Sequence, residues 1–368
     1  MSKVKVIISG GGTGGHIFPA IAIANALKKL QSDVEILFVG ALGKMEMEKV
    51  PAAGYEIIGL NIAGLNRSNM LKNLTFPFKL IGSLLKSLKI IRDFKPNVVV
   101  GVGGFASGPV MYAANSVRIP TVIQEQNSYA GITNKLLGGK ASKVCVAYDG
   151  MDKFFPAKNI IRTGNPVRQD ILNLAGKREE GQKTFNLDPN KKTLLVIGGS
   201  LGARSMNLAV KANIEAFRKA GVQVVWQTGK LFIDEAKKAV EDANATHFFV
   251  SDFIYTMNQA YAVADVVLSR AGASSISELC IVGKPAVLVP FPFAAEDHQT
   301  KNAQALVDAD AAILIPDNKA GAEACEASLN LLSNEAEMQK LSTNIKKLAL
   351  PNADEVIAKE ILKLAKAA

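Results

Sequence analysis

The sequence is poor in the residues that build disulfide and metal frameworks. Its 368 residues include only three cysteines and three histidines. Cys145, Cys280 and Cys325 lie far apart and form no Cys-x-x-Cys pair. An odd number of widely spaced cysteines argues against a disulfide scaffold and against a structural zinc site. We therefore expect buried thiols, no resident metal and no other cofactor.

Long apolar runs are also lacking. Although 48% of the residues are hydrophobic, no uninterrupted apolar stretch approaches the roughly 20 residues of a membrane-spanning helix. The first residues, MSKVKVIISGG, pass directly into an expected strand and a glycine turn, without the apolar block of a signal peptide. The sequence therefore predicts a protein that does not span the membrane and that remains in the cytosol.

Positive charge exceeds negative charge by a wide margin. The formal net charge of +10 predicts attraction to an anionic partner, such as a phosphorylated substrate, an anionic lipid or a nucleic acid. No block of lysine and arginine with interleaved aromatic residues is present, nor is a recognisable nucleic-acid module. We therefore expect an anionic substrate or a lipid surface as the partner, and no nucleic acid.

Short β-branched runs alternate with longer helical patterns, and the alternation occurs twice. The first series comprises residues 4–9, 34–39, 97–102 and 121–124, and the second comprises 193–197, 223–226, 248–250, 265–268, 286–289 and 312–315. This βαβ alternation predicts two Rossmann-like α/β domains with parallel sheets, facing each other across a cleft. A stretch rich in proline and charge, 154–191, separates the two series. We place the domain boundary near residue 163.

Each domain begins with a strand that runs into a glycine-rich turn. Residues 9–20 read SGGGTGGHIFPA, and residues 198–204 read GGSLGAR. Glycines between a strand and a helix expose backbone N–H groups at the positive end of the helix dipole and admit a bulky anion. The turns therefore predict phosphate or diphosphate sites, and a purely steric role as tight turns is the alternative.

The first turn also spells the dinucleotide fingerprint, through Gly10, Gly12 and Gly15. An NAD site usually has an acidic residue at the end of the second strand, where it holds the ribose. Here that strand ends in Gly-Ala-Leu, residues 40–42. The fingerprint is therefore a weak match, and we expect a different diphosphate. His16, directly behind the last glycine, is a candidate catalytic residue, with a structural role as the alternative.

The densest polar stretch of the second half follows an expected strand. Residues 269–279, SRAGASSISEL, combine small residues with hydroxyl groups that can bond phosphate oxygens. Glu278 lies one turn into the following helix, where its carboxylate can accept hydrogen bonds from two ribose hydroxyls. A serine-capped helix with a solvated glutamate is the alternative. Further along, Gln299 and Asn302 are candidates for fixing sugar hydroxyls.

Seven motifs, in order along nearly the whole chain, resemble one family. They are GGGTGGHIFPA (10–20), GVGGFASGP (101–109), EQN with GITNK (125–127 and 131–135), GNPVR (164–168), GGSLGAR (198–204), SRAGASSISE (269–278) and DHQTKNA (297–303). Together they resemble the MurG family, whose members transfer N-acetylglucosamine (GlcNAc) from UDP-GlcNAc to undecaprenyl-pyrophosphoryl-MurNAc-pentapeptide, lipid I. The resemblance implies a GT-B fold and an inverting transferase that forms a β-1,4 bond and gives lipid II in peptidoglycan synthesis.

The resemblance also implies the division of labour between the domains. The acceptor is held mainly by the N-terminal domain (1–163) and UDP-GlcNAc mainly by the C-terminal domain (164–349), while the last helix, about 350–368, packs back on the first domain. The implied donor-binding residues are Thr13, Gly14, Gly15, Asn127, Arg168, Ser200, Ile254, Ala273, Ser274, Ser275, Ile276, Ser277, Glu278 and Gln299. Ile254 acts through its backbone against uracil, and Gly104 and Asn134 lie on the acceptor side. Two positions depart from the family pattern: Gln124 replaces a common histidine, and Ser274 replaces a common hydrophobic residue.

The implied reaction inverts the anomeric carbon, so the acceptor's C4 hydroxyl attacks in a single displacement and needs a general base. His16 is the first candidate for this base and Glu125 the second. Asp308 and Asp310 spell the Asp-x-Asp pattern with which transferases of another fold bind a metal, but they fall at an expected helix end. We therefore expect helix dipoles, backbone amides and Arg168 to stabilise the leaving diphosphate without metal.

A lipid acceptor requires a surface that faces the membrane, and residues 67–92 are basic and amphipathic. The apolar spacing predicts a helical face that is buried on the sheet, formed by Ile81, Leu84, Leu85, Leu88 and Ile91. The segment before that face is predicted to contact the membrane through Met70, Leu71, Lys72, Leu74, Phe76 and Phe78. The expected partners are UDP-GlcNAc, the undecaprenyl-linked acceptor and an anionic membrane surface, with other cell-wall synthesis proteins as further candidates. The expected location is peripheral, on the cytoplasmic face of the plasma membrane.

Three rival functions remain open at this stage. The nearest is a GT-B enzyme that transfers a UDP-sugar to another lipid, such as diacylglycerol. A second is an NAD-dependent oxidoreductase or a nucleotide-sugar epimerase, although the chain lacks the epimerase pair Tyr-x-x-x-Lys. A third is a non-catalytic protein of the membrane surface, which leaves the nucleotide-type motif around Glu278 unexplained. Acceptor assays and cofactor binding distinguish these rivals.

Overall fold

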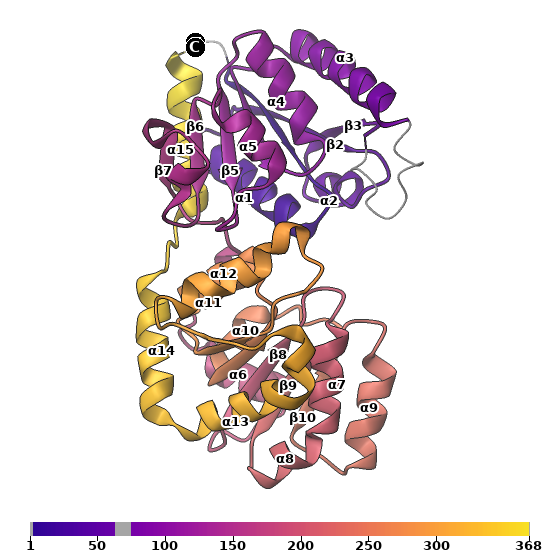
Figure 1. Ribbon diagram of the computed structural model, residues 1–368, viewed down its shortest axis with the longest axis vertical. Helices are drawn as coiled ribbons and strands as arrows, with labels where there is room; N and C mark the ends of the chain where they lie inside the picture. The colour runs from indigo at the N-terminus through magenta and orange to yellow at the C-terminus, as the bar shows by residue number, and fades with distance from the viewer. Residues whose placement is uncertain (1–2, 63–74, 368) are drawn as a thin grey trace. The chain divides into compact units, whose positions relative to one another are not determined.

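The computed structural model describes residues 3–62 and 75–367, which fall into two compact units (Figure 1). Unit 1 comprises Met1–Val167 together with Pro351–Ala368, and unit 2 comprises Arg168–Leu350. The chain therefore passes from unit 1 to unit 2 after Val167, a few residues beyond the position that the sequence suggests. It returns to unit 1 for its last helix, α15 (Ala353–Ala367).

Unit 1 is built on a parallel sheet of seven strands in the order β3-β2-β1-β4-β5-β6-β7. The strands are β1 (Lys5–Gly10), β2 (Glu35–Ala41), β3 (Glu56–Leu60), β4 (Val98–Gly103), β5 (Thr121–Glu125), β6 (Lys143–Val146) and β7 (Ile160–Arg162). The helices are α1 (Gly14–Leu30), α2 (Glu46–Ala52), α3 (Phe76–Phe94), α4 (Ser107–Ser116), α5 (Ile132–Gly138) and α15. The strand order reverses direction between β1 and β4, and ligands of such sheets bind outside the carboxyl ends of the strands at this point.

Side chains that alternate along β1 divide the core of unit 1 between the two faces of the sheet. Val6 and Ile8 pack in one cluster with Ile23 of α1 and Ile361 of α15, whereas Ile7 packs in the other with Met111 of α4. The last helix of the chain therefore completes the core that the first strand begins. Figure 1 shows α15 beside α1.

Helix α3 turns a different face to the protein from the one that the sequence predicts. Ile81, Leu85 and Leu88 are 57%, 63% and 36% exposed, whereas Ser83 and Ser87 are buried. The prediction that the leucine and isoleucine face is buried is therefore wrong for these three residues, although Ile91 is buried as predicted. Helix α3 packs against α4 (Figure 1), and the side that it turns to the protein includes Ser83, whose hydroxyl donates to the Asn61 carbonyl oxygen at 3.4 Å. The buried Ser87 hydroxyl donates a hydrogen bond of 2.7 Å to the Ser83 carbonyl oxygen of the same helix.

Unit 2 repeats the same architecture with a parallel sheet of six strands in the order β10-β9-β8-β11-β12-β13. The strands are β8 (Thr193–Ile197), β9 (Gln223–Gln227), β10 (Phe248–Ser251), β11 (Val266–Ser269), β12 (Ala286–Leu288) and β13 (Ile313–Leu314). The helices are α6 (Lys177–Thr184), α7 (Arg204–Ala212), α8 (Ile214–Lys219), α9 (Ile233–Asp242), α10 (Met257–Val263), α11 (Ala273–Val282), α12 (His298–Val307), α13 (Cys325–Ser333) and α14 (Glu335–Lys347). The prediction of two parallel α/β domains is confirmed.

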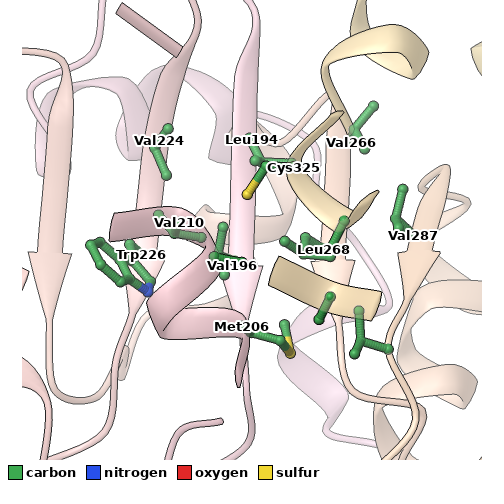
Figure 2. Packing of buried hydrophobic residues seen from close by; sticks show 14 of the residues in the cluster. Leu194, Val196, Met206, Val210, Val224, Trp226, Val266, Leu268, Val287 and Cys325 are labelled. Atoms are coloured by element: carbon green, nitrogen blue, oxygen red, sulfur yellow. The ribbon is translucent and has the colours of Figure 1, made fainter. Parts of the chain in front are cut away.

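One hydrophobic cluster of unit 2 lies between its sheet and the helices that cover one face. Side chains of β8, β9, β11 and β12 point toward Met206 and Val210 of α7 and Cys325 of α13 (Figure 2). The only tryptophan, Trp226, is fully buried there, and its indole N–H donates to Asn207 Oδ1 at 3.0 Å. In the described part of the chain, no helix combines the length and the apolar character that crossing a membrane requires.

Candidate functional site

The first glycine turn lies at the carboxyl end of β1 and leads into α1, with Thr13 as the residue before the helix. Gly14 and Gly15 form the start of the first turn of α1, and His16 follows them. The His16 Nδ1 atom lies 3.1 Å from the Gly11 carbonyl oxygen and 3.2 Å from Thr13 Oγ1. A carbonyl oxygen can only accept, so Nδ1 carries the proton in this hydrogen bond. In the neutral ring, Nε2 is then the basic nitrogen.

The end of β4 packs against this turn. Gly103 and Gly104 have φ values of +97° and +89°, which side chains disfavour. A Cβ atom on Gly104 would lie 2.3 Å from the Gly11 carbonyl oxygen, and one on Gly103 would lie 2.7 Å from His16 Cδ2. These glycines are therefore needed for the close approach of the turn to β4, and Gly104, a predicted acceptor-side residue, lies directly beside the turn.

Glu125, at the end of β5, is buried and fully engaged in hydrogen bonds. Its carboxylate accepts from the backbone N–H groups of Asn127 and Gly131, each at 3.0 Å, and from Asn134 Nδ2 at 2.8 Å. The Asn127 side chain adds a longer bond of 3.3 Å. The structure thus joins three predicted site residues, Glu125, Asn127 and Asn134, in one cluster. Four donor groups therefore occupy the two oxygens of this carboxylate.

The second glycine turn follows β8, and Ser200 is exposed within it. The neighbouring Gln227, the last residue of β9, connects this turn to the predicted uracil contact. Its Oε1 atom accepts from the Ile254 N–H at 2.9 Å, and its Nε2 atom donates to the Gly199 carbonyl oxygen at 3.0 Å. Ile254 is itself buried. Gln227 was not predicted from the sequence, and it fixes the backbone group through which Ile254 is expected to act.

Helix α11 carries the predicted nucleotide motif. Gly272 precedes the helix in an extended conformation, and residues 273–275 form its first turn, where backbone N–H groups lack acceptors within the helix. Glu278 lies one turn further and accepts a hydrogen bond of 2.9 Å from the Tyr261 hydroxyl. Burial raises the pKa of Glu278 to about 7, although the Tyr261 bond and the charge of Arg168 oppose this rise. The remaining predicted residues of this stretch, Ile276 and Ser277, lie on the same helix.

Arg168 and Gln299 border the same end of unit 2. The Arg168 guanidinium forms an ion pair with Asp170 at 2.7 Å and a longer bond of 3.4 Å to the Tyr255 carbonyl oxygen. Gln299, in the first turn of α12, accepts from the Phe291 N–H at 2.9 Å through Oε1. Asn302, one turn later, is fully buried.

A buried ion pair joins three loops at this end of the sheet. Arg270, which follows β11, donates to Asp317 Oδ1 at 2.5 Å and to the carbonyl oxygens of Val289 and Pro290 at 3.0 Å. Ser205, in the first turn of α7, donates to the same Asp317 oxygen. Sequence reasoning missed the roles of Ser205 and Asp317, because nothing in the local pattern pairs residues more than 100 positions apart.

Two further residues of the site were not predicted. Tyr261 donates a hydrogen bond to Glu278, 17 positions further along the chain. Glu46 of α2 accepts a hydrogen bond from the Gly12 N–H in the first glycine turn.

Within residues 3–62 and 75–367, no group of three or more histidine, cysteine, aspartate or glutamate side chains could hold a metal ion. Asp310, of the Asp-x-Asp pattern, forms an ion pair with Lys340 at 2.7 Å. The predicted membrane contacts Met70, Leu71, Lys72 and Leu74 lie outside the described residues.

Comparisons with known proteins agree with this geometry. Residues 6–146 match the glycosyltransferase family 28 N-terminal domain, and residues 193–361 match the glycosyltransferase family 28 C-terminal domain. A UDP-N-acetylglucosamine--N-acetylmuramyl-(pentapeptide) pyrophosphoryl-undecaprenol N-acetylglucosamine transferase from Bacteroides fragilis is 54% identical over 98% of this chain and 96% of its own length. The transferase of the same name from Flavobacterium psychrophilum is 54% identical, over 99% of this chain and 98% of its own.

A solved structure of the same family has the same fold as this chain. The crystal structure of Acinetobacter baumannii MurG superimposes with a TM-score of 0.78 and 28% identity, over 98% of this chain and 99% of that one. Both domains, their order and nearly the full length therefore agree with one family of two-domain, GT-B-type transferases. The chain belongs to glycosyltransferase family 28, and within it to the MurG enzymes.

Proposed function

We propose that this chain moves GlcNAc from UDP-GlcNAc to the C4 hydroxyl of MurNAc in undecaprenyl-pyrophosphoryl-MurNAc-pentapeptide, with a β-1,4 bond, and so makes lipid II for peptidoglycan synthesis. The observation that carries the proposal is the 54% identity, over 98% of the chain, to transferases named for this reaction. The half-buried Glu278, one turn into α11, supplies the chemistry expected of a sugar-nucleotide site.

Unit 2 is proposed to bind the donor. The N–H groups in the first turn of α11, at residues 273–275, are suited to the diphosphate because they sit at the positive end of the helix dipole. Arg168 adds a positive charge at the same edge, and Ser200 adds a hydroxyl. The carboxylate of Glu278 accepts hydrogen bonds from the ribose hydroxyls, and the backbone of Ile254 contacts uracil. Gln299 is proposed to fix hydroxyls of the GlcNAc ring. Unit 1 adds Thr13, Gly14, Gly15 and Asn127 to the proposed donor-binding set.

His16 is the better of the two predicted general bases. Its Nδ1 proton is directed to the Gly11 carbonyl oxygen, which orients Nε2 as the proton acceptor. The carboxylate of Glu125 is instead occupied by donors from Asn127, Gly131 and Asn134. In the proposed step, the acceptor's O4 forms a bond to the anomeric carbon while its proton passes to His16 Nε2. The bond from that carbon to the UDP oxygen breaks, and UDP leaves with the electron pair.

A membrane surface is proposed for the outer face of unit 1. Phe78, Ile81, Leu85 and Leu88 follow the 3-4 spacing of one helical stripe and are all exposed on α3. Lysines 79, 86 and 89 and Arg92 lie on the same helix. Exposed apolar side chains with basic neighbours bind the headgroup region of anionic bilayers. The predicted contacts Phe76 and Phe78 thus become part of a helix, and the buried face of the sequence prediction becomes its lipid-facing side.

This surface continues onto the neighbouring helices. Helix α4 packs against α3 and exposes Tyr112, and α5 packs against α4 and exposes Ile132 and Leu136. Gly104, which follows β4, and Asn134, which lies on α5, are proposed for the acceptor side and belong to the same unit. The exposed apolar residues of α3, α4 and α5 support the proposal of a peripheral enzyme on the cytoplasmic face of the plasma membrane, with its lipid acceptor reaching unit 1.

The proposed function is tested by titrating the protein calorimetrically with UDP-GlcNAc, UDP-glucose and NAD in the absence of added metal. Preferential binding of UDP-GlcNAc that is lost in Glu278→Ala supports the donor site, whereas binding of NAD contradicts it. Turnover is then measured with lipid I and with diacylglycerol as acceptors. Transfer to diacylglycerol alone would replace the proposed acceptor with that of the rival lipid glycosyltransferase.

Membrane binding is tested on vesicles that contain anionic lipid. The double variant Ile81→Ser/Leu85→Ser is expected to sediment less with the vesicles than the wild type. Leu208→Ser, at a 40% exposed position on α7 of unit 2, is the matched control. Equal sedimentation of the double variant and the control would contradict the proposal that α3 contacts the membrane.

A further inference from the structure

Glu46 is a buried carboxylate at the first position of α2, and it is bonded to the backbone of two other segments. Its Oε2 atom accepts from the Gly12 N–H at 2.9 Å, and its Oε1 atom accepts from the Ala41 N–H at 3.0 Å. Only 1% of the residue is exposed. A buried carboxylate is stable only where donors replace the lost water. Here the donors are the first glycine turn and the end of β2.

Two glycines leave the space that this side chain fills. A Cβ atom on Gly11 would lie 2.2 Å from Glu46 Cδ, and one on Gly40 would lie 2.5 Å from Glu46 Cγ. Both distances are too short for any side chain. The carboxylate of Glu46 therefore fills the space beside Gly11 of the first glycine turn and beside Gly40 of β2.

The same turn holds His16. The Gly11 carbonyl oxygen accepts from His16 Nδ1 at 3.1 Å, and the Gly11 N–H donates to the Gly103 carbonyl oxygen at 3.2 Å. Glu46 bonds the next residue, Gly12, and its carboxyl group fills the space beside Gly11. A short chain of contacts therefore runs from the carboxylate through the turn to the imidazole. Displacing the turn would change the orientation of the ring.

We propose that Glu46 is a positioning residue for GlcNAc transfer: its carboxylate occupies the anion-binding N–H of the first glycine turn and fixes Gly11, which orients His16 as the base. The inference rests on the proposed function, because it gives Glu46 a role only through His16. One consequence is that the Gly12 N–H belongs to the protein's own carboxylate, so the diphosphate of the donor takes its hydrogen bonds elsewhere.

The test compares Glu46→Gln with the wild type under saturating acceptor. Glutamine keeps the shape but offers one acceptor oxygen and one NH₂ donor, so one of the two N–H groups loses its partner. Misplacing a catalytic group by about 1 Å costs about 10²-fold in rate. We expect kcat to fall about 10²-fold while the KM for UDP-GlcNAc stays unchanged. Glu48→Gln is the matched control, since Glu48 lies on the same helix with an exposed side chain.

A double-mutant cycle separates positioning from a general loss of structure. If Glu46 acts through His16, Glu46→Gln adds no further loss of kcat to His16→Ala, whereas independent sites give additive losses. Glu46→Ala, which removes the carboxylate and leaves a space, is expected to regain kcat when acetate is added. Additive losses, or a Glu46→Gln variant with the kcat of the wild type, would overturn the proposal.

Nitrogen NMR gives a readout that needs no turnover. Because the chain contains only three histidines, the ¹⁵N signals of His16, His247 and His298 can each be assigned. Glu46→Gln is expected to change the tautomer signals of His16 and to leave those of His247 and His298 as they are. Unchanged His16 signals would overturn the proposal even where the variant is too unstable for kinetics. If the wild type itself fails to transfer GlcNAc while this change is seen, the proposed function fails and the structural link from Glu46 to His16 stands.

Discussion

The affinity for UDP-GlcNAc is expected to depend on pH through Glu278. Burial raises the pKa of this carboxyl group to about 7, and the proposed bonds from ribose hydroxyls need its charged, accepting form. With a pKa of about 7, about 1% of the groups are ionised at pH 5 and about 90% at pH 8. An apparent Kd scales inversely with the binding-competent fraction. The Kd should therefore fall about 90-fold between these pH values, which is about 2.7 kcal/mol.

Isothermal titration with UDP-GlcNAc from pH 5 to pH 8 measures this dependence. Glu278→Gln cannot titrate at this position, so its Kd is expected to be weak and nearly independent of pH. Tyr261→Phe removes the hydrogen bond that lowers the pKa of Glu278, so the midpoint of the pH dependence should move upward. A wild-type Kd that changes by less than about threefold, about 0.65 kcal/mol, across this range would refute the reasoning.

The stability of the unliganded protein should depend on pH in the opposite sense. A carboxyl group whose pKa is higher in the folded state than in the unfolded state binds its proton more tightly when folded. Glu278 therefore contributes its full share to the free energy of unfolding below about pH 4.5, the ordinary pKa of a glutamate. This contribution is lost as the pH rises to about 7, the pKa in the folded state. Urea unfolding of the wild type and of Glu278→Gln, compared at these two pH values, isolates this contribution.

Three further perturbations test the fold and the chemistry. Gly202→Ala is expected to lower the urea midpoint of unit 2, because φ is +76° and the new Cβ would lie 1.9 Å from the Thr228 carbonyl oxygen; the fluorescence of Trp226 reports the transition. Ile361→Ala should destabilise unit 1 by about 2–5 kcal/mol, since it leaves a cavity in a fully buried part of the core, and calorimetry would show a lower Tm. Turnover is expected to be unaffected by EDTA, because the N–H groups of α11 and Arg168 are proposed to stabilise the leaving diphosphate, and a loss that Mg²⁺ restores would contradict the proposed role of α11.

The two parallel α/β domains could be predicted from the sequence because their central strands have a clear pattern. β1 and β8 are nearly continuous apolar runs followed by glycines, as fully buried parallel strands are expected to be. β3, β6 and β7 were not predicted. Each carries a charged residue at one end, Glu56, Lys143 and Arg162 respectively, which shortens its apolar run.

The error on α3 has a different origin. Hydrophobic periodicity ranks faces by apolar content, and it therefore assigns the leucine and isoleucine stripe to the core. The structure instead buries the small polar side chains of Ser83 and Ser87, whose hydroxyl groups donate to the carbonyl oxygens of Asn61 and Ser83. Composition alone cannot say which side of this helix faces the protein.

Residues of the candidate site could be proposed from the sequence where they belong to a contiguous motif, but not where their contacts are with a distant partner. Glu278 and His16 lie in such motifs. Glu46 meets Gly12 across 34 positions, and Asp317 meets Ser205 across 112. These contacts depend on the tertiary structure, which brings a helix start or a loop to a strand end. No local pattern marks a glutamate as the partner of a glycine turn.

The return of the chain to unit 1 sets an order on its synthesis. The side chains of Ile23 and Leu27 on α1 pack in the same cluster as Ile357 and Ile361 of α15, and the whole of unit 2 is encoded between them. At about 5–20 residues/s, a ribosome needs about 10–40 s to make these roughly 200 residues. During that interval unit 2, which is one continuous segment, can fold completely. Unit 1 still lacks α15, so the apolar side chains of α1 that α15 covers stay exposed. Until α15 is made, the exposed apolar surface of α1 is a binding site for a chaperone. A chain that ends before α15 keeps this surface exposed.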